Sequence, residues 1–530
     1  MCIVCVNKID KERMKDKSFR KVLATILVLA VLSAMLLVSA CCNKEDKLGT
    51  LSGNVVLIND TGNSQLDPID YAGVTISLYK LAEPDTAVVR INQQHPYLGV
   101  IVQQEMYFDH RYQQPVLSVS SEPDGSFKLV KINPGSYNLV AKKDGWGYAY
   151  LYALDISEGA NTLGKDTCND KTPKGLAKTK SDSGKETITL YPERQLSGFG
   201  TSDLVFLTSR HYVVTDDFAV MPGTQVKFER NTTIRINPHK ELVLYSNLEC
   251  PAPGGGFFRI ISNDKTAVAD TLTPFQRIRI AEAVGLQPQV FRNAIIRDSY
   301  SGVVSNSSGL TVSRCFISSR QTAVSIYNTT DNQIVNCVLC DGKNSSFGAA
   351  MNDGSPSAII QNNIIVKNSL GIFIRNSVDV EVSNNYFTNC GMGLLNQMDV
   401  NTSVMNNTFS DCTVGIRNAN RAMMYAYNNE FQVMSGICNE RDTGTSATAG
   451  ITQFQANNNN FRCETWNVYA AKIQGMPTFS LDCTNNYWET ADQAAIRQKI
   501  FDSQNSSSNA TVFFIPYRNG KVLNAGVQPL

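Results

Sequence analysis

Residues 381–410 read EVSNNYFTNC GMGLLNQMDV NTSVMNNTFS and contain one short pattern twice. In each copy an Asn is followed by one variable residue and then by a large apolar residue, from Asn385 to Phe387 and from Asn407 to Phe409. The two copies lie 22 residues apart. A repeat period near 22 residues is typical of a solenoid.

The pattern occurs nine times, and the successive steps are 21, 22, 27, 22, 22, 22, 30 and 27 residues. The copies begin at Asn293, Arg314, Asn336, Asn363, Asn385, Asn407, Asn429, Asn459 and Asn486. Side chains alternate between the two faces of a strand, so the apolar residue of each copy is predicted to point inward and the residue before it mostly outward. The predicted inward column is Ile295, Phe316, Val338, Ile365, Phe387, Phe409, Phe431, Phe461 and Trp488.

The segments between the copies are rich in Gly, Asn, Asp and Ser and show no helical periodicity, which predicts short strands and turns. Coils of this length stack as parallel strands about 4.8 Å apart, so the pattern predicts a parallel β-helix. Asn suits a corner between strands and can form a ladder of stacked side chains, a structural role that needs no ligand. The predicted ladder is Asn293, Asn336, Asn363, Asn385, Asn407, Asn429, Asn459 and Asn486. Gly371, Gly393 and Gly415 lie in register and predict a second corner.

The chain here resembles the right-handed parallel β-helix family, the pectin-lyase-like proteins, over residues 196–530. Residues 212–215 (YVVT) and 221–228 (MPGTQVKF) look like the opening coils of that family. Residues 485–488 (NNYW), a helical stretch at 491–501 and residues 512–516 (VFFIP) look like its usual close. These motifs imply a fold and no particular activity.

Residues 1–40 combine a basic start with an apolar run from Val22 to Val38, which predicts a signal sequence. The run ends in VSAC, which resembles the bacterial lipobox and implies a lipid on Cys41. Residues 41–49 are predicted to be a tether, and their CNKEDK resembles the surface-export signal of Bacteroidetes lipoproteins. The resemblance implies an outer-membrane lipoprotein in the periplasm or, preferably, on the cell surface. A transmembrane anchor is the alternative.

Residues 50–195 show alternating strands and hairpin turns, for example in residues 72–79 and 123–129. They resemble the carboxypeptidase regulatory-like, transthyretin-like β-sandwich, which is generally a spacer or binding module. Insertions are predicted at 89–114 and 164–185. His95, Asp109 and His110 in the first insertion are expected to be solvated rather than to bind metal.

Without residues 1–40 the chain has 41 basic and 44 acidic residues, a formal charge of −3, so nucleic acid is not an expected partner. A polysaccharide remains compatible with this charge. The Cys pairs at 315 and 337 and at 390 and 412 occupy equivalent positions of neighbouring coils. Stacked thiols are favoured over disulfides there, because parallel side chains rarely give the required dihedral angle.

Polysaccharide-cleaving β-helices need a base such as Arg or Lys, or paired carboxylates, on the outer face of one sheet. The candidates here are Arg375, Arg417, Asp353 and Asp399, although an ordinary solvated face also accounts for them. Calcium is expected only if the protein is a lyase, and no metal or other cofactor is predicted. No His lies between residues 293 and 530, which removes the commonest general base from the regular coils.

These observations favour a non-enzymatic, lipid-anchored scaffold that binds a glycan or another surface component. Tyr386, Tyr425, Tyr427 and Tyr487 are candidate stacking residues for sugars. A polysaccharide lyase or glycoside hydrolase and a purely structural envelope protein are the alternatives. The expected fold is all-β, an N-terminal β-sandwich followed by a right-handed parallel β-helix.

Overall fold

The computed structural model describes residues 48–59, 70–164, 187–264, 272–282, 288–343, 348–440, 452–471, 478–505, 508 and 510–529. Cys41, the predicted signal sequence and most of the predicted insertion at 164–185 lie outside these residues, so those predictions stay predictions. Within the described part, none of the helices has the length and apolar character needed to cross a membrane.

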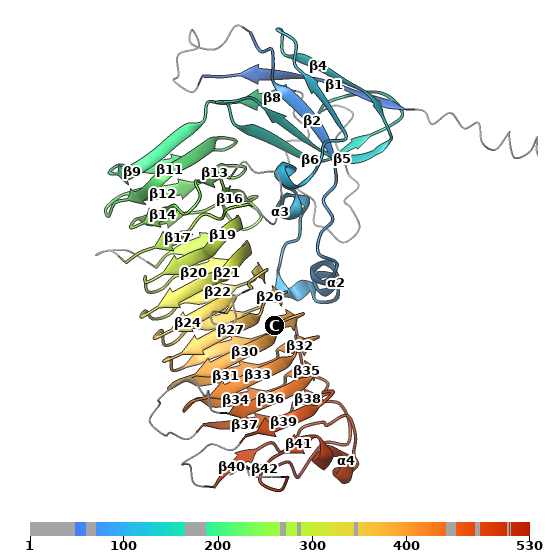
Figure 1. Ribbon diagram of the computed structural model, residues 1–530, viewed down its shortest axis with the longest axis vertical. Helices are drawn as coiled ribbons and strands as arrows, with labels where there is room; N and C mark the ends of the chain where they lie inside the picture. The colour runs from blue at the N-terminus through green and yellow to red at the C-terminus, as the bar shows by residue number, and fades with distance from the viewer. Residues whose placement is uncertain are drawn as a thin grey trace, which may run out of the picture.

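The predicted all-β fold is confirmed: a β-sandwich stands at one end of a long right-handed parallel β-helix (Figure 1). The sandwich consists of two four-stranded sheets that enclose one apolar core, in which Leu51, Ile76 and Leu139 are fully buried. The first sheet contains β1 (Gly49–Leu57), β4 (Ser126–Ile132), β7 (Gly159–Thr162) and β8 (Thr187–Leu190). The second contains β2 (Thr75–Lys80), β3 (Leu117–Ser120), β5 (Gly135–Lys142) and β6 (Tyr148–Ile156).

The β-helix begins with β9 (Arg194–Gly200), β10 (Leu204–Phe206), β11 (His211–Val220), β12 (Gln225–Phe228) and β15 (Asn247–Glu249). Its coils have three faces, which we call A, B and C. Four strands run through the corner from face A to face B, namely β9, β11, β19 (Ala294–Ser305) and β21 (Phe316–Tyr327).

Face A contains β13 (Thr233–Ile236), β16 (Phe258–Ser262), β23 (Val338–Cys340), β26 (Ile364–Val366), β29 (Tyr386–Thr388), β32 (Thr408–Ser410), β35 (Glu430–Gln432) and β38 (Asn460–Phe461). Face B contains β14 (Glu241–Leu244), β17 (Arg277–Ile280), β24 (Ala350–Asp353), β27 (Leu370–Arg375), β30 (Met392–Gln397), β33 (Val414–Ala419), β36 (Ser435–Glu440), β39 (Trp466–Ala470) and β41 (Ile500–Phe501).

Face C is a ten-stranded parallel sheet. Its strands are β18 (Val290–Arg292), β20 (Thr311–Ser313), β22 (Gln333–Val335), β25 (Ile359–Gln361), β28 (Val380–Ser383), β31 (Asn401–Met405), β34 (Met423–Tyr427), β37 (Gln453–Asn457), β40 (Phe479–Asp482) and β42 (Ala510–Phe513). Helix α4 (Gln493–Gln498) lies at the C-terminal end of the β-helix.

The interior of the β-helix contains a column of apolar side chains that repeat from coil to coil. The rings of Phe387, Phe409, Phe431, Phe461 and Trp488 stack with centroids 4.6–5.1 Å apart and planes within 11° of parallel. Gly371, Gly393 and Gly415, predicted to mark a second corner, lie instead within β27, β30 and β33, where they provide the room for these rings. A Cβ atom on Gly393 would lie 2.5 Å from Cδ1 of Phe409 and 2.6 Å from the carbonyl oxygen of Gly415.

The predicted register is wrong by one residue in the first three coils. Val338 pairs with Ile364 rather than with Ile365, so Ile295, Phe316 and Val338 point outward on face A. The inward side chains there are Ile296, Ile317 and Leu339, which pack in the same core as Ile365 and Phe387. In a coil with two adjacent Asn residues, either one can be taken as the start of the repeat. The single Asn of the earlier coils is equivalent to the first of the two, so the pattern counted from the second is shifted by one residue there.

The Asn residues form two columns with different roles. Side chains of Asn363, Asn385, Asn407, Asn429, Asn459 and Asn486 are buried, and each of the first five donates from Nδ2 to the Oδ1 of the next at 2.9–3.0 Å. The residues just before them have left-handed φ angles of 55–59°, namely Asn362, Asn384, Asn406, Asn428, Asn458 and Asn485.

Asn293 and Asn336 belong to this left-handed column and not to the ladder predicted for them. Their φ angles are 57° and 56°. The ladder continues instead through Cys337, whose N–H donates to Oδ1 of Asn363 at 2.9 Å. The N–H of Cys315 in turn donates to Sγ of Cys337 at 3.5 Å. Both cysteines are buried free thiols, as are Cys390 and Cys412.

Candidate functional site

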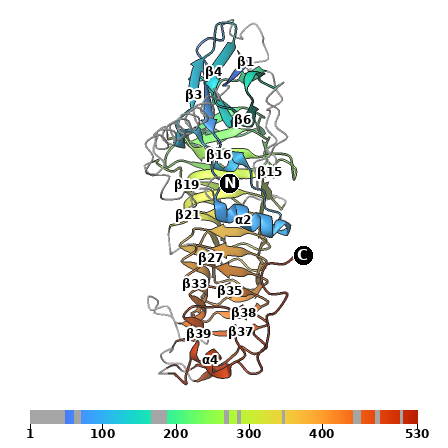
Figure 2. The same ribbon diagram turned by 90° about the vertical axis from the view of Figure 1, so that its right-hand side faces the viewer.

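Face A of the β-helix is covered by a long insertion between β2 and β3, residues 81–116. It contains α2 (Thr86–Gln94) and α3 (Gln104–Tyr107), and α2 lies across the strands of face A (Figure 2). The outward residues Ile295, Phe316 and Val338 pack there against Val88 and Ile91 of α2, among other apolar side chains. The insertion is therefore a docking element and not the solvated loop expected from the sequence.

The three polar residues singled out in this insertion are largely withdrawn from solvent. Side chains of Asp109 and His110 are 1% and 8% exposed, and His95 is half-buried, with Nδ1 2.6 Å from the hydroxyl of Tyr97. The expectation that they are solvated is wrong, because the insertion folds onto the β-helix. The described residues contain no group of three or more His, Cys, Asp or Glu side chains placed to hold a metal ion.

A buried ionic cluster fastens the insertion to the β-helix. The guanidinium of Arg111 donates to Asp109 at 2.7 Å, to Asp298 at 2.7 Å and to the carbonyl oxygen of Ser262 at 2.6 Å. Burial alone raises the pKa of Asp109, but the charge and hydrogen bonds of Arg111 outweigh it and hold that pKa well below its ordinary value. Asp109 is thus ionised and paired inside the interface.

The C-terminal segment covers the rest of face A. Val527 joins the same apolar cluster, and its N–H donates to the hydroxyl of Thr408 at 3.1 Å. Lys521 forms an ion pair with Glu430 at 2.7 Å. The predicted stacking residue Tyr386 is buried beneath this layer, with its ring 5.5 Å from that of His95, so it is not a sugar platform.

Face B is not covered by these elements and presents two columns of outward side chains. The first column is Met351, Phe373, Leu395, Arg417, Cys438, Tyr469 and Phe501. The second is Tyr327, Asp353, Arg375, Gln397 and Ala419. Six rung spacings separate the ends of the first column, a length of about 29 Å.

Aromatic side chains mark both ends of this face. At the C-terminal end, the rings of Tyr469 and Phe501 stack 4.7 Å apart, and Trp466 packs edge-on against Phe501 at 5.5 Å. All three are half-buried. At the other end, the buried side chains of Met351 and Phe373 support the partly buried Tyr327, Met392 and Leu395, which form the accessible part of a second apolar cluster. Face B thus joins two apolar platforms through a central polar segment.

The structure brings three of the four catalytic candidates to face B. Arg375 and Asp353 are neighbours in one column and form an ion pair in which Nε donates to Oδ1 at 3.1 Å. Hydrogen bonding to Asp353 raises the pKa of Arg375. Arg417 lies in the other column, between Leu395 and Cys438.

The fourth candidate, Asp399, lies in the turn after β30 with a φ of 47° and forms an ion pair with Arg421. Two rungs separate it from Asp353, about 10 Å along the axis before any sideways offset. The paired carboxylates of glycosidases lie about 5–9.5 Å apart. Asp353 and Asp399 therefore do not form such a pair.

The other predicted stacking residues have different places. Tyr425 and Tyr427 lie on the outer side of face C, where Tyr425 is 37% exposed and the hydroxyl of Tyr427 donates to Sδ of Met405. The hydroxyl of Tyr487 donates to the carbonyl oxygen of Glu489 at 3.1 Å. The Trp466 platform on face B was missed, although Trp466 and Tyr469 lie three positions apart in a short strand that follows the polar residues Glu464 and Thr465.

Comparison with known proteins adds a partial family match. The model of the family described as periplasmic copper-binding protein (NosD) matches residues 276–445, about a third of the chain. No curated protein matches the sequence.

Two solved structures are similar at 10% sequence identity each. The catalytic domain of a GH87 alpha-1,3-glucanase in complex with nigerose matches over 89% of this chain and 88% of its own, with a TM-score of 0.23. A family 28 exopolygalacturonase from Yersinia enterocolitica matches over 85% of this chain and 93% of its own, with a TM-score of 0.20. The fold assignment rests on the strand pairing described above.

Proposed function

We propose that this protein is a lipid-anchored envelope protein that binds an extended polysaccharide along face B without cleaving it. The observation that carries the proposal is the pair of aromatic and apolar platforms at the two ends of one parallel sheet. Aromatic rings stack on the apolar faces of sugar rings, and the Asp353–Arg375 ion pair beside the first platform offers hydrogen bonds to hydroxyl groups. Strands at a regular spacing suit a polymer, such as a polysaccharide, whose units also repeat along its length.

Binding without cleavage is supported by the state of the charged groups. Asp353 is already paired with Arg375, and Asp399 with Arg421. A general acid needs a carboxyl group that is protonated near neutral pH, and an ion pair with Arg favours the opposite state. The carboxylates of Asp353 and Asp399 also lie too far apart to act as the paired acids of a glycoside hydrolase.

An envelope location is supported by the signal-like N-terminus and by the word periplasmic in the description of the partly matching family. The copper named there does not fit the described residues. Burial raises the pKa of Cys250 to about 12 and that of Cys463 well above its ordinary value, so these thiols are protonated. No cluster of three His, Cys, Asp or Glu ligands occurs in the part of the chain that the structure covers.

The proposal is tested by affinity electrophoresis of the full-length protein in mild detergent, through gels cast with neutral and with uronic-acid polysaccharides. We expect retardation in at least one gel, with no cleared zone when the polymer is stained. Trp466→Ala should weaken that retention about tenfold, because it removes one stacking platform.

Tyr425→Ala is the matched control, because it removes an exposed aromatic residue from face C and leaves face B intact. Equal loss of retention in both variants would contradict the assignment to face B. A cleared zone at the protein band would show that the protein is an enzyme. Unretarded migration in every gel would favour a purely structural role in the envelope.

A further inference from the structure

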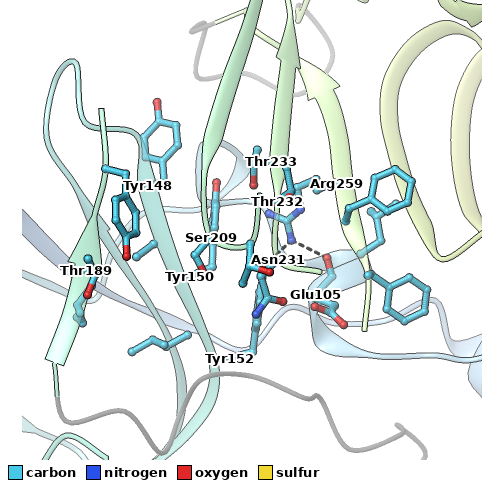
Figure 3. A pocket seen from close by; sticks show the side chains of 18 of the residues that line it. Glu105, Tyr148, Tyr150, Tyr152, Thr189, Ser209, Asn231, Thr232, Thr233 and Arg259 are labelled. Atoms are coloured by element: carbon cyan, nitrogen blue, oxygen red, sulfur yellow. Dashed lines mark hydrogen bonds between the residues drawn. The ribbon is translucent and has the colours of Figure 1, made fainter. Parts of the chain in front are cut away.

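A separate cavity of about 290 Å³ lies where the sandwich meets the first coils of the β-helix (Figure 3). Its walls come from β6 and β8 of the sandwich, from Glu105 of α3, and from the β-helix around Ser209, Asn231 and Arg259. Pockets for small molecules span about 300–1,000 Å³, so this one has the size for a single small ligand.

Glu105 is the unusual group in this cavity. It is only 5% exposed, and burial raises its pKa to about 7 against the opposing charge of Arg259. Arg259 does not donate to its carboxylate. Nη2 of Arg259 donates instead to the backbone carbonyl oxygen of Glu105 at 2.7 Å and to the hydroxyl of Tyr152 at 2.6 Å. The carboxylate therefore has no hydrogen-bond donor among the described residues.

The guanidinium of Arg259 is the second group in this cavity with an unsatisfied hydrogen-bonding atom. Arg259 is 5% exposed, and its Nη1 has no hydrogen-bond partner. Its guanidinium lies over the ring of Tyr150 at 4.6 Å, and the rings of Tyr150 and Tyr152 are parallel and 6.0 Å apart. A buried donor and acceptor without partners cost about 1–3 kcal/mol each, so a ligand that satisfies both is favoured.

The chemistry of this pair selects the class of ligand. A hydroxyl group both donates and accepts, so adjacent hydroxyls on one molecule can donate to Glu105 and accept from Arg259. An anionic ligand is repelled by the carboxylate and a cationic one by the guanidinium. Ser209, Asn231 and Thr232 add further hydroxyl and amide groups to the wall (Figure 3). We propose that this cavity binds a neutral polyhydroxy molecule the size of one sugar ring.

The test is a titration of the full-length protein in mild detergent with single neutral monosaccharides, followed by saturation-transfer NMR of the sugar protons. D-Glucose, D-galactose, D-mannose and N-acetylglucosamine are the probes, with D-glucuronate as an anionic comparison and glycine as a zwitterionic one that could pair with Glu105 and Arg259 at once. We expect saturable binding of at least one neutral sugar and weaker binding of glucuronate and of glycine, which lacks the adjacent hydroxyl groups.

Glu105→Leu should weaken that binding at least tenfold, because it removes both acceptor oxygens, and Glu105→Gln should weaken it less, because its amide keeps one. Glu158→Leu is the matched control, since Glu158 is exposed in a turn of the sandwich. Thermal unfolding shows that each variant is folded. The proposal is overturned if no neutral sugar binds saturably, if Glu105→Leu and Glu158→Leu bind alike, or if glucuronate or glycine binds more tightly.

Discussion

The Asn ladder is expected to be the largest polar contribution to the stability of the β-helix, and Asn407→Ala tests it. Asn407 is fully buried. Its Nδ2 donates to the carbonyl oxygen of Val382 at 2.8 Å and to Oδ1 of Asn429 at 3.0 Å. Its Oδ1 accepts from the backbone N–H of Asn385 at 2.9 Å and from the Nδ2 of that residue at 3.0 Å.

The alanine variant leaves the N–H of Asn385 and the carbonyl oxygen of Val382 buried without these partners. Each unsatisfied buried group costs about 1–3 kcal/mol, so the expected loss is about 3–5 kcal/mol. Asn406→Ala is the matched control one residue earlier. Asn406 has a φ of 55°, and alanine in that conformation costs about 1–2 kcal/mol.

Urea unfolding monitored by circular dichroism compares the two variants, and hydrogen exchange of the Asn385 N–H locates the effect. We expect the midpoint to fall clearly further in Asn407→Ala, with loss of protection at Asn385. Equal midpoints, or a larger fall in Asn406→Ala, would refute the division of these residues into a ladder and a corner column.

Three further variants probe the interface, the cavity and the core. Arg111→Ala leaves buried Asp109 without its charge partner and should cost about 3–5 kcal/mol, seen as faster limited proteolysis between sandwich and β-helix. The folded-state pKa of Glu105, about 7, exceeds its ordinary value of 4.5, so its stabilising protonation is complete below pH 4.5 and lost as pH rises through 7. The unfolding free energy of the wild type minus that of Glu105→Gln should therefore fall by about 3 kcal/mol as the pH rises from 4.5 to 7. A difference that does not change with pH would contradict the burial of this carboxyl group. Gly393→Ala should cost about 1–3 kcal/mol through its contact with the stacked rings, measured by thermal unfolding against Gly520→Ala, which has open space around its Cβ position and should be nearly neutral.

The repeat period predicted the β-helix because identical side chains must lie on one another when coils of equal length stack. The same logic fails to fix the register where the anchor changes from a single to a double Asn, between Asn336 and Asn363. Cys337 occupies the ladder position in that coil. Because this residue is Cys and not Asn, the sequence does not show that the Asn ladder continues there. A pattern of residue types cannot distinguish two registers one residue apart when both place apolar residues on alternating sites.

The site was harder to predict because it depends on contacts between distant segments. Nothing local in residues 81–116 shows that this insertion covers face A, and so Tyr386 looked exposed. One signal was present for the cavity: Arg259 interrupts an apolar strand, in FRIIS. A charged residue in an otherwise apolar strand needs a buried partner, and such partners gather at functional sites and interfaces.

Coverage of face A decides which surface remains for an extended ligand. The insertion and the C-terminal segment bury the outward apolar residues of that face, including Ile364 and Tyr386, so a glycan reaches them only if these segments leave. Their departure would break the partly buried ion pair between Arg111 of the insertion and Asp298 of β19, a cost of several kcal/mol that a weak surface ligand does not offset. Face B keeps its half-buried aromatic residues without any such cost. A polysaccharide is therefore expected on face B even though the fold alone would allow it on any of the three faces.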